Sequence, residues 1–182
     1  NSRDIIHQYR DSLAWFTSEA DRGIGHAFNK GFLKSRGRII GFLNADDWYE
    51  PFAVETALQS LSQTDADIAY APMFLHFSPS GFSVNDGNHH LLPLLNSMNH
   101  PTVFARRHCF IRHGLFREDL KISVDYEWLL RQYHRKSTFC YLDRPITHMS
   151  LGGLSTFGKY GIMENLLIRS AYGLPPTANL AM

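Results

Sequence analysis

The chain has 182 residues, a length typical of one domain, with 44% hydrophobic and 19% charged residues. This composition excludes a disordered chain, because disordered chains contain too few apolar residues to bury a core. Eighteen Lys and Arg against 17 Asp and Glu give a formal net charge of +1, which argues against a protein that coats nucleic acid by charge alone. No uncharged apolar run approaches the roughly 18 residues of a transmembrane helix. Two cysteines, Cys109 and Cys140, are too few for a disulfide framework and point to a reducing compartment.

The first 43 residues predict helix and strand in alternation. Residues 4–10 have the apolar spacing of a short helix, and the apolar run 13–16 predicts a buried strand. A charged, glycine-rich loop over 17–25 then leads into a helix that begins at Ile24 and stops before Gly37. The run 38–43 (RIIGFL) is almost continuously apolar, which predicts a strand covered on both faces.

The middle of the chain continues this alternation. Pro51 fits the first turn of a helix, and we expect Val54, Leu58 and Leu61 to form its buried face. Residues 67–77 predict a strand that Pro72 places at an edge or a bulge, and residues 79–90 predict a hairpin or a mobile loop. Strands that alternate with helices favour an α/β domain with a largely parallel sheet over this half.

The second half is less regular and predicts a mixed sheet. We expect an extended segment over 100–104, a helix that opens at Asp125, and a strand over 138–142. A flexible glycine loop over 152–156 and a last helix over 161–172 follow.

Two neighbouring carboxylates, Asp46 and Asp47, directly follow the 38–43 strand. Ligands of open α/β sheets bind beyond the carboxyl ends of the strands. Paired carboxylates there would suit Mg²⁺ or Mn²⁺ together with substrate phosphates. On the residues alone, either aspartate could equally cap the helix after Pro51.

Asp125 stands at the start of the clearest predicted helix. The residue pattern by itself favours a helix cap, and the functional alternative is a general base that accepts a proton from a substrate hydroxyl. Glu127 is expected to be solvated. The ten histidines contain no HExxH pattern, which argues against a histidine-based zinc site.

The loop 21–23 and the helix segment 29–31 bring Asp21, Arg22, Asn29 and Lys30 to one helix N-terminus. Such a place suits an anion, while the alternative is a charged surface loop. Arg106 and Arg107 could likewise contact a diphosphate or a solvated sheet edge.

Five segments then stand in a distinctive order: Ser18–Ile24 with Ala27–Gly31, Gly41–Asp47 (GFLNADD), His100–Phe104, Val124–Arg131 and Gly152–Ser155. In this order they resemble family 2 glycosyltransferases of the colanic-acid and exopolysaccharide type. The first two segments are similar to the family's SExDxGIYDAMNKG and GFLNADD patterns. The next two are similar to its acceptor-side strand and the helix that carries its base, and the last to its late glycine loop.

The resemblance implies a GT-A fold, a Rossmann-like mixed sheet with helices on both faces, in one domain over 1–174 with a disordered tail over 175–182. It implies an inverting transferase that uses a nucleotide-diphospho-sugar and Mn²⁺ or Mg²⁺ in bacterial polysaccharide and cell-envelope biosynthesis. The implied acceptor is a saccharide or a lipid-linked acceptor, with no nucleic-acid partner. The implied location is the cytoplasm, with peripheral contact at the inner membrane.

The resemblance also assigns roles. Asp46 and Asp47 fall on the metal-binding DxD-type motif, with Asp46 also near the ribose of the donor, and Asp125 falls on the catalytic base, six residues before Arg131. The residues that the resemblance places on the donor side are Asp21, Arg22, Asn29 and Lys30.

Several positions depart from the family pattern. Asn44 replaces the first Asp of DxD, Val124 replaces the Glu before the base, and Gly25-His26 replaces Tyr-Asp. The family's opening strand, with its PTYN-like turn, and its DGS segment are absent, so we expect an N-terminally truncated chain that begins at Asn1. Two alternatives follow: an inactive fragment that acts as a binding module, and a phosphoryl hydrolase that uses Asp46 and Asp47.

Overall fold

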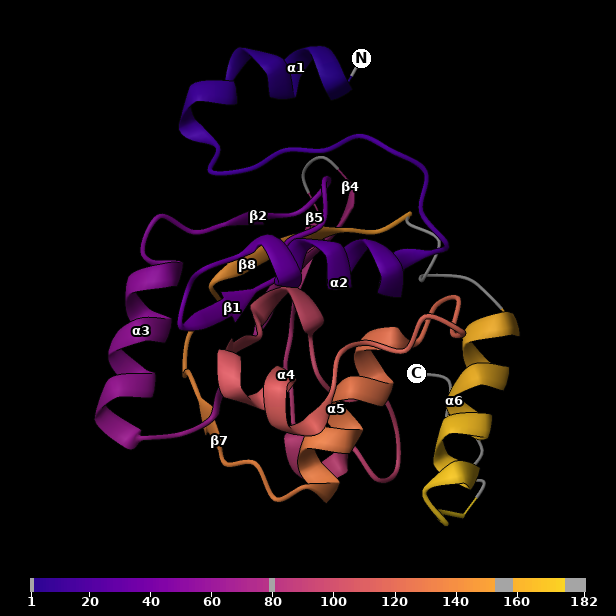
Figure 1. The fold of residues 1–182 in the computed structure, drawn as a ribbon. Helices are drawn as coiled ribbons and strands as arrows, with labels where there is room; N and C mark the ends of the chain where they lie inside the picture. The colour runs from indigo at the N-terminus through magenta and orange to yellow at the C-terminus, as the bar shows by residue number, and fades with distance from the viewer. Residues whose placement is uncertain (1, 79–80, 153–158, 176–182) are drawn as a thin grey trace.

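Two four-stranded mixed sheets form the centre of the protein, with helices around them (Figure 1). The computed structural model describes residues 2–78, 81–152 and 159–175. The first sheet has the order β1 (Ile39–Gly41), β6 (Phe104–Arg106), β3 (Ile68–Tyr70) and β7 (Phe139–Tyr141). The second has the order β2 (Trp48–Tyr49), β8 (Thr147–Ser150), β4 (Met73–Ser78) and β5 (Gly81–Asn85).

Strand directions agree with part of the prediction. In the first sheet, β3 pairs parallel with β7, but β6 lies between β1 and β3 and runs antiparallel to both. The sheet is therefore mixed from its first strand, rather than largely parallel over the first half of the chain. Pro72 stands between β3 and β4, where the chain leaves the first sheet for the second, so the predicted strand over 67–77 is two strands. The predicted hairpin is confirmed as the antiparallel pair β4–β5.

The helices are α1 (Ser2–Gln8), α2 (Ile24–Lys34), α3 (Ala53–Thr64), α4 (Arg107–His113), α5 (Val124–His134) and α6 (Lys159–Ala171). Short 3-10 turns occur at η1 (Arg10–Ser12), η2 (His89–Leu91) and η3 (His100–Thr102). The predicted helices over 4–10, 24–36 and 161–172 and the helix at Asp125 are confirmed, whereas α4 was not anticipated. The expected extended segment over 100–104 begins instead with the η3 turn.

Side-chain alternation along β3 divides the core between the two faces of the first sheet. Ile68 belongs to the cluster that packs against α4 and α5, and Ala69 belongs to the cluster under α3. On α3 the buried face is Ala53, Ala57 and Leu61. The prediction was correct for Leu61 but wrong for Val54 and Leu58, which are 48% and 43% exposed. The two alanines fill the buried face instead, because their small side chains let the helix approach the sheet closely.

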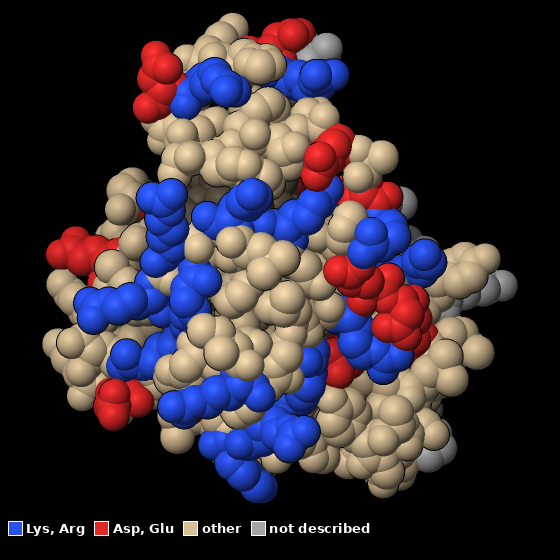
Figure 2. Space-filling model, viewed as in Figure 1, with Lys and Arg blue, Asp and Glu red and all other residues tan. Residues whose placement is uncertain are grey.

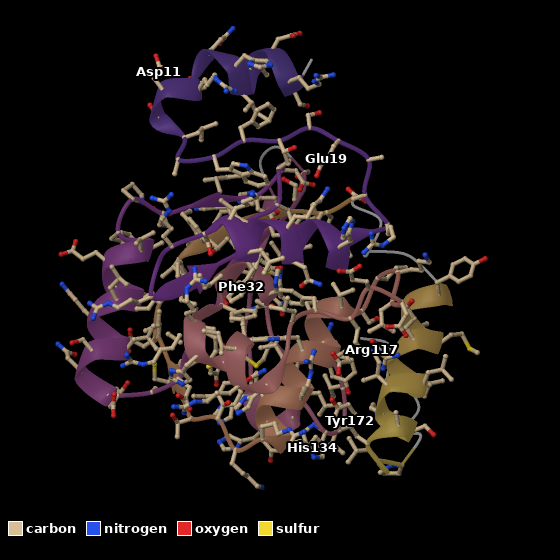
Figure 3. All side chains as sticks on the ribbon, viewed as in Figure 1. Asp11, Glu19, Phe32, Arg117, His134 and Tyr172 are labelled. Atoms are coloured by element: carbon tan, nitrogen blue, oxygen red, sulfur yellow. The ribbon has the colours of Figure 1, made fainter. Side chains whose placement is uncertain are left out.

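Aromatic contacts join the helices of the opposite face. The ring of Phe32 on α2 lies 4.9 Å from that of Phe110 on α4, and Phe110 stacks on Trp128 of α5 at 4.3 Å. Beyond the end of α6, Tyr172 stacks on His134 at 4.8 Å, which holds α6 against α5 (Figure 3). Helices therefore cover both faces of the first sheet, as predicted.

The second sheet is organised around His148 of β8. Its ring stacks on Trp48 of β2 at 4.7 Å and on Phe74 of β4 at 4.6 Å, both directly opposite it across the strands. Its two ring nitrogens contact Glu50 (2.9 Å) and His76 (2.8 Å). These cross-strand pairs stabilise the short strand β2, which directly follows Asp46 and Asp47.

Two local predictions were wrong. Residues 13–16 form no strand, and Leu13 and Trp15 are each 42% exposed, because this segment pairs with neither sheet. Glu127 is only 3% exposed rather than solvated. Its carboxylate accepts hydrogen bonds from Arg131 (2.7 Å) and from the Tyr172 hydroxyl (2.9 Å). Of the predicted glycine loop, residues 153–156 lie outside the described residues.

The buried ion pair between Glu127 and Arg131 leads to a stability prediction. Glu127→Ala leaves the Arg131 guanidinium buried without its counter-charge, so we expect the free energy of unfolding to fall by about 3 kcal/mol. Urea denaturation followed by tryptophan fluorescence measures this change. The control is Glu19→Ala, which removes an exposed ion pair with Lys30 and should cost less than about 1 kcal/mol. Equal losses in the two variants would contradict a structural role for Glu127.

Candidate functional site

Asp46 and Asp47 lie in a tight turn between β1 and β2. Asp46 is exposed, whereas Asp47 is 8% exposed and held in place by its neighbours. Its backbone N–H donates to the Asn44 carbonyl (3.3 Å), and its carboxylate accepts the Asn44 side-chain amide (3.0 Å). The turn closes on itself through Asn44, and α3 begins only at Ala53. Neither aspartate therefore caps that helix.

The environment of Asp47 favours its neutral form. Burial raises the pKa of its carboxyl group, and the negative charge of Asp46 adds to this effect, while hydrogen bonds from Asn44 and from the Ser150 backbone oppose it. Burial, and then the Asp47 charge, raise the pKa of the nearby Tyr49 to about 12. The Tyr49 hydroxyl is buried and has no hydrogen-bond partner within the described residues. Within the described ranges, the site thus combines two carboxylates, one of them buried, with a hydroxyl that has no hydrogen-bond partner, and no Lys, Arg or His forms an ion pair with either carboxylate.

Asp125 lies at the first turn of α5, partly buried. Its carboxylate accepts a hydrogen bond from the backbone N–H of Tyr126 (2.8 Å). His100 of η3 stacks on Phe28 at 5.2 Å. Burial lowers the pKa of His100, while the charge of Asp125 acts on it in the opposite direction, so the two groups interact. A neutral imidazole therefore stands beside the carboxylate proposed as the base.

One cavity connects these two parts of the molecule. It has a volume of about 650 Å³, and its wall contains both Asn44, the partner of Asp47, and Asp125 with His100. Residues 85–99, between β5 and η3, form much of the rest of the wall. The cavity thus runs from the turn that holds the paired carboxylates to the start of α5.

Sequence analysis missed the 85–99 wall. The signal for it was available, since Asn85, Asn88, Asn96 and Asn99 are concentrated in 15 residues. Side-chain amides of this density are unusual in a segment that connects a strand to a helical turn. Such enrichment suits a surface that binds a polar ligand.

The residues that the resemblance assigned to the donor side lie just before α2 and along it, and each of them already has a partner within the protein. Asp21 accepts the Gly23 backbone N–H (2.9 Å), and Arg22 pairs with Glu118. Lys30 pairs with Glu19 at 3.0 Å, on the loop that leads to α2 (Figure 3). These contacts are sufficient to hold the loop in place in the absence of a ligand.

Asn29 is buried and structural. Its side-chain amide donates to the Phe116 carbonyl (2.9 Å) and to Glu118 (3.1 Å), and its oxygen accepts the Phe116 N–H (3.0 Å). Both of its polar groups are therefore occupied by the protein. Arg107 is also structural, since its guanidinium donates to the Gly37 carbonyl (2.7 Å) and to Ser35 (2.6 Å).

A separate group, Asp67, His108 and Cys109, has the side-chain types of a metal site. Protein contacts explain it. One Asp67 oxygen contacts His108 (2.7 Å), and the other accepts hydrogen bonds from the backbone N–H and the hydroxyl of Thr138. Burial, followed by the Asp67 charge, raises the pKa of the Cys109 thiol to about 12, which favours the protonated thiol in the metal-free protein.

None of the helices in the described ranges combines the length and the apolar character that crossing a membrane requires.

Comparison with known proteins identifies relatives of this arrangement. A model of the family described as Glycosyl transferase family 2 matches residues 1–136. The uncharacterized glycosyltransferase RT0329 of Rickettsia typhi is 30% identical over 136 residues, which cover 68% of this chain and 42% of that protein. The O-antigen biosynthesis protein RfbC of Myxococcus xanthus is 26% identical over 160 residues, 80% of this chain and 12% of that protein.

Among solved structures, S. aureus TarS 1-349 in complex with UDP-GlcNAc matches with a TM-score of 0.72 at 16% identity, over 92% of this chain and 51% of that one. The same protein in complex with UDP matches with a TM-score of 0.70, over 93% and 52%. At this identity the likeness establishes the fold, which is the GT-A fold. The chain spans less than half the length of the curated relatives named above. Since the family model covers 136 of the 182 residues, the chain belongs to glycosyl transferase family 2.

Proposed function

We propose that this protein transfers a sugar from a nucleotide-diphospho-sugar to a saccharide or lipid-linked acceptor in polysaccharide synthesis, with inversion at the anomeric carbon. Family membership supports sugar transfer, and the likeness to an O-antigen biosynthesis protein supports a role in polysaccharide synthesis. The TarS structures contain UDP-GlcNAc and UDP, so a UDP-sugar is the first donor to test.

One observation carries the proposal. Asp125 and Asn44, the hydrogen-bond partner of Asp47, line the same cavity although they are far apart in the sequence. A transferase needs its leaving diphosphate and its incoming hydroxyl on opposite sides of one sugar. Asp125 lines the cavity, and Asn44 links the cavity wall to the neighbouring turn that carries Asp46 and Asp47, which lie outside the wall, so a sugar bound between them would meet both groups.

In the proposed reaction, Asp125 accepts the proton of the acceptor hydroxyl as its oxygen attacks the anomeric carbon. The bond from that carbon to the diphosphate oxygen breaks at the same time, and the nucleoside diphosphate leaves with the electron pair. A single displacement from the opposite face inverts the configuration, with oxocarbenium character on the sugar. Burial lowers the pKa of His100 beside Asp125, although the Asp125 charge opposes this, and so disfavours an imidazolium that would form an ion pair with the carboxylate.

Asp46 and Asp47 are the residues proposed to hold Mn²⁺ or Mg²⁺. Their oxygens are the ligands that these ions prefer, and a cation would offset the burial and the charge of Asp46, which together raise the pKa of Asp47. When bound, the ion supplies positive charge to the departing diphosphate. We assign Asp21, Arg22, Asn29 and Lys30, with Asp46, to the donor side. There Arg22 and Lys30 can exchange a carboxylate partner for phosphate, and Asn29 fixes the loop.

We further propose a cytoplasmic location with peripheral contact at the inner membrane and no nucleic-acid partner. The distribution of cations supports the membrane contact. Lys and Arg gather on the face that carries α2 and α4 (Figure 2), and Lys34, Arg36 and Arg112 are exposed there. A basic face of this kind is attracted to anionic lipids.

The first prediction for this function concerns the base. Asp125→Asn removes the proton acceptor but preserves the shape of the side chain, so we expect transfer to fall by about 10²- to 10⁴-fold. The affinity for UDP-GlcNAc with Mn²⁺, measured by calorimetry, should stay within about twofold. The matched control is Asp143→Asn, an exposed carboxylate outside the cavity, which should retain full transfer. Full transfer by Asp125→Asn would mean that another group is the base.

The second prediction concerns the metal. EDTA should abolish transfer, and added Mn²⁺ should restore it. Asp47→Asn removes one negative charge from the pair, so we expect its Mn²⁺ affinity, followed by electron paramagnetic resonance, to fall at least tenfold. Asp143→Asn again serves as the control and should bind Mn²⁺ as the unaltered protein does. Transfer that continues in EDTA, or equal Mn²⁺ binding by the two variants, would contradict the assignment to Asp46 and Asp47.

A further inference from the structure

The Asp, Glu, Lys and Arg side chains that line the cavity within the described residues are all acidic. Two carboxylates, Asp86 and Asp125, line the cavity, and no Lys or Arg does so within the described residues. The wall also contains His100, which burial keeps neutral near pH 7. A bound ligand therefore meets negative charge and no positive charge on this surface.

Many of the Lys and Arg side chains lie instead on the outer surface, on the face that carries α2 and α4 (Figure 2).

The amides of the wall keep unused hydrogen-bonding capacity. Asn85 and Asn99 bond to each other through their side chains (2.9 Å), and Asn88 accepts the His90 backbone N–H (3.0 Å). The amide nitrogen of Asn88 and both polar atoms of Asn96 make no hydrogen bond within the described ranges. The wall thus offers donors and acceptors together, which is what hydroxyl groups require, since each hydroxyl both donates and accepts.

Between these amides the wall is apolar. Met73, Leu75, Leu91, Leu95 and Met149 line it, and Leu91 and Leu95 are partly exposed at 38% and 41%. The C–H faces of a sugar ring can pack on such side chains while its hydroxyls reach the amides. A phosphate or carboxylate placed here would lose water without gaining a counter-ion and would be repelled by two carboxylates.

We propose that the cavity selects a neutral saccharide as the acceptor and rejects one that carries a phosphate or carboxylate beside the accepting hydroxyl. The proposal rests on the transfer function argued above and narrows its acceptor. A lipid-linked acceptor then fits only if its terminal sugar is uncharged and stands away from the lipid diphosphate.

Matched probes on one aglycone test this selection. The probes are the 4-methylumbelliferyl glycosides of N-acetylglucosamine, of its 6-phosphate and of glucuronic acid. Binding to the full chain is followed by saturation-transfer NMR and titration at low ionic strength, with Mn²⁺ and UDP present. We expect the neutral glycoside to bind at least about tenfold more tightly than either anion.

A charge variant provides the converse test. Asn96→Lys places a cation on the wall at an exposed position that makes no internal hydrogen bond, so it should fold normally. We expect it to raise the affinity for the 6-phosphate about tenfold relative to the neutral probe. The matched control Asn96→Gln keeps the amide and should leave the ratio of the two affinities unchanged.

The results of these experiments distinguish a failure of the acceptor proposal from a failure of the transferase proposal. Binding of UDP-GlcNAc with Mn²⁺, and slow UDP release without an acceptor, test the donor side alone. If those succeed while an anionic probe binds as well as the neutral one, or while no probe binds, the acceptor proposal is overturned and the transferase stands. If donor binding itself fails, the transferase proposal fails first.

Discussion

The site depends on a carboxylate that the fold buries beside another carboxylate. Asp47 is removed from water next to Asp46, and its carboxylate accepts two hydrogen bonds from the described residues, from Asn44 and from the Ser150 backbone. Burial and then the charge of Asp46 disfavour its ionised form and raise its pKa. The cation proposed above would offset both effects, which is why the metal is assigned to this turn.

The strand before the turn holds this carboxylate in place. Gly41 ends β1 against the ring of Phe104 and the hydroxyl of Tyr49, and a Cβ atom there would lie 3.0 Å from the ring and 3.2 Å from the hydroxyl. Any larger side chain would push these groups away from the turn. Tyr49 in turn belongs to β2, which the stacked rings around His148 keep attached to the second sheet. Close packing on both sides therefore fixes the position of the turn, and the Asn44 amide holds the Asp47 carboxylate within it.

Local sequence patterns predicted which helices and strands form better than they predicted which strands pair with one another. The helix at Asp125 could be predicted from its apolar spacing, and the strand before Asp46 from its nearly continuous apolar run, in which Ile40 and Ile39 face the two core clusters on opposite sides of the sheet. The position of β6 between β1 and β3 could not be predicted, since strand order depends on pairs of residues that are 35 to 67 positions apart in the chain. Glu127 was misjudged for the same reason: its partner Tyr172 lies 45 residues away. Motif order predicted Asp46, Asp47 and Asp125 as site residues, whereas the concentration of asparagines over residues 85–99 was present in the sequence but gained a meaning only with the cavity that they line.

Residues other than Asp125 make the contacts that hold α5 in place, so the proposed role of Asp125 in the reaction is distinct from the stability of the helix. Immediately after it, Tyr126 is fully buried and donates its hydroxyl to the Leu92 carbonyl (2.9 Å). One turn further, Arg131 holds the carbonyls of His113 and Leu115, at 2.8 and 2.7 Å. Helix α5 is thus anchored by groups other than Asp125, whose own carboxylate contributes one hydrogen bond to the adjacent backbone. Because the helix does not need the Asp125 charge, a loss of transfer on its neutralisation can be assigned to the reaction rather than to the fold.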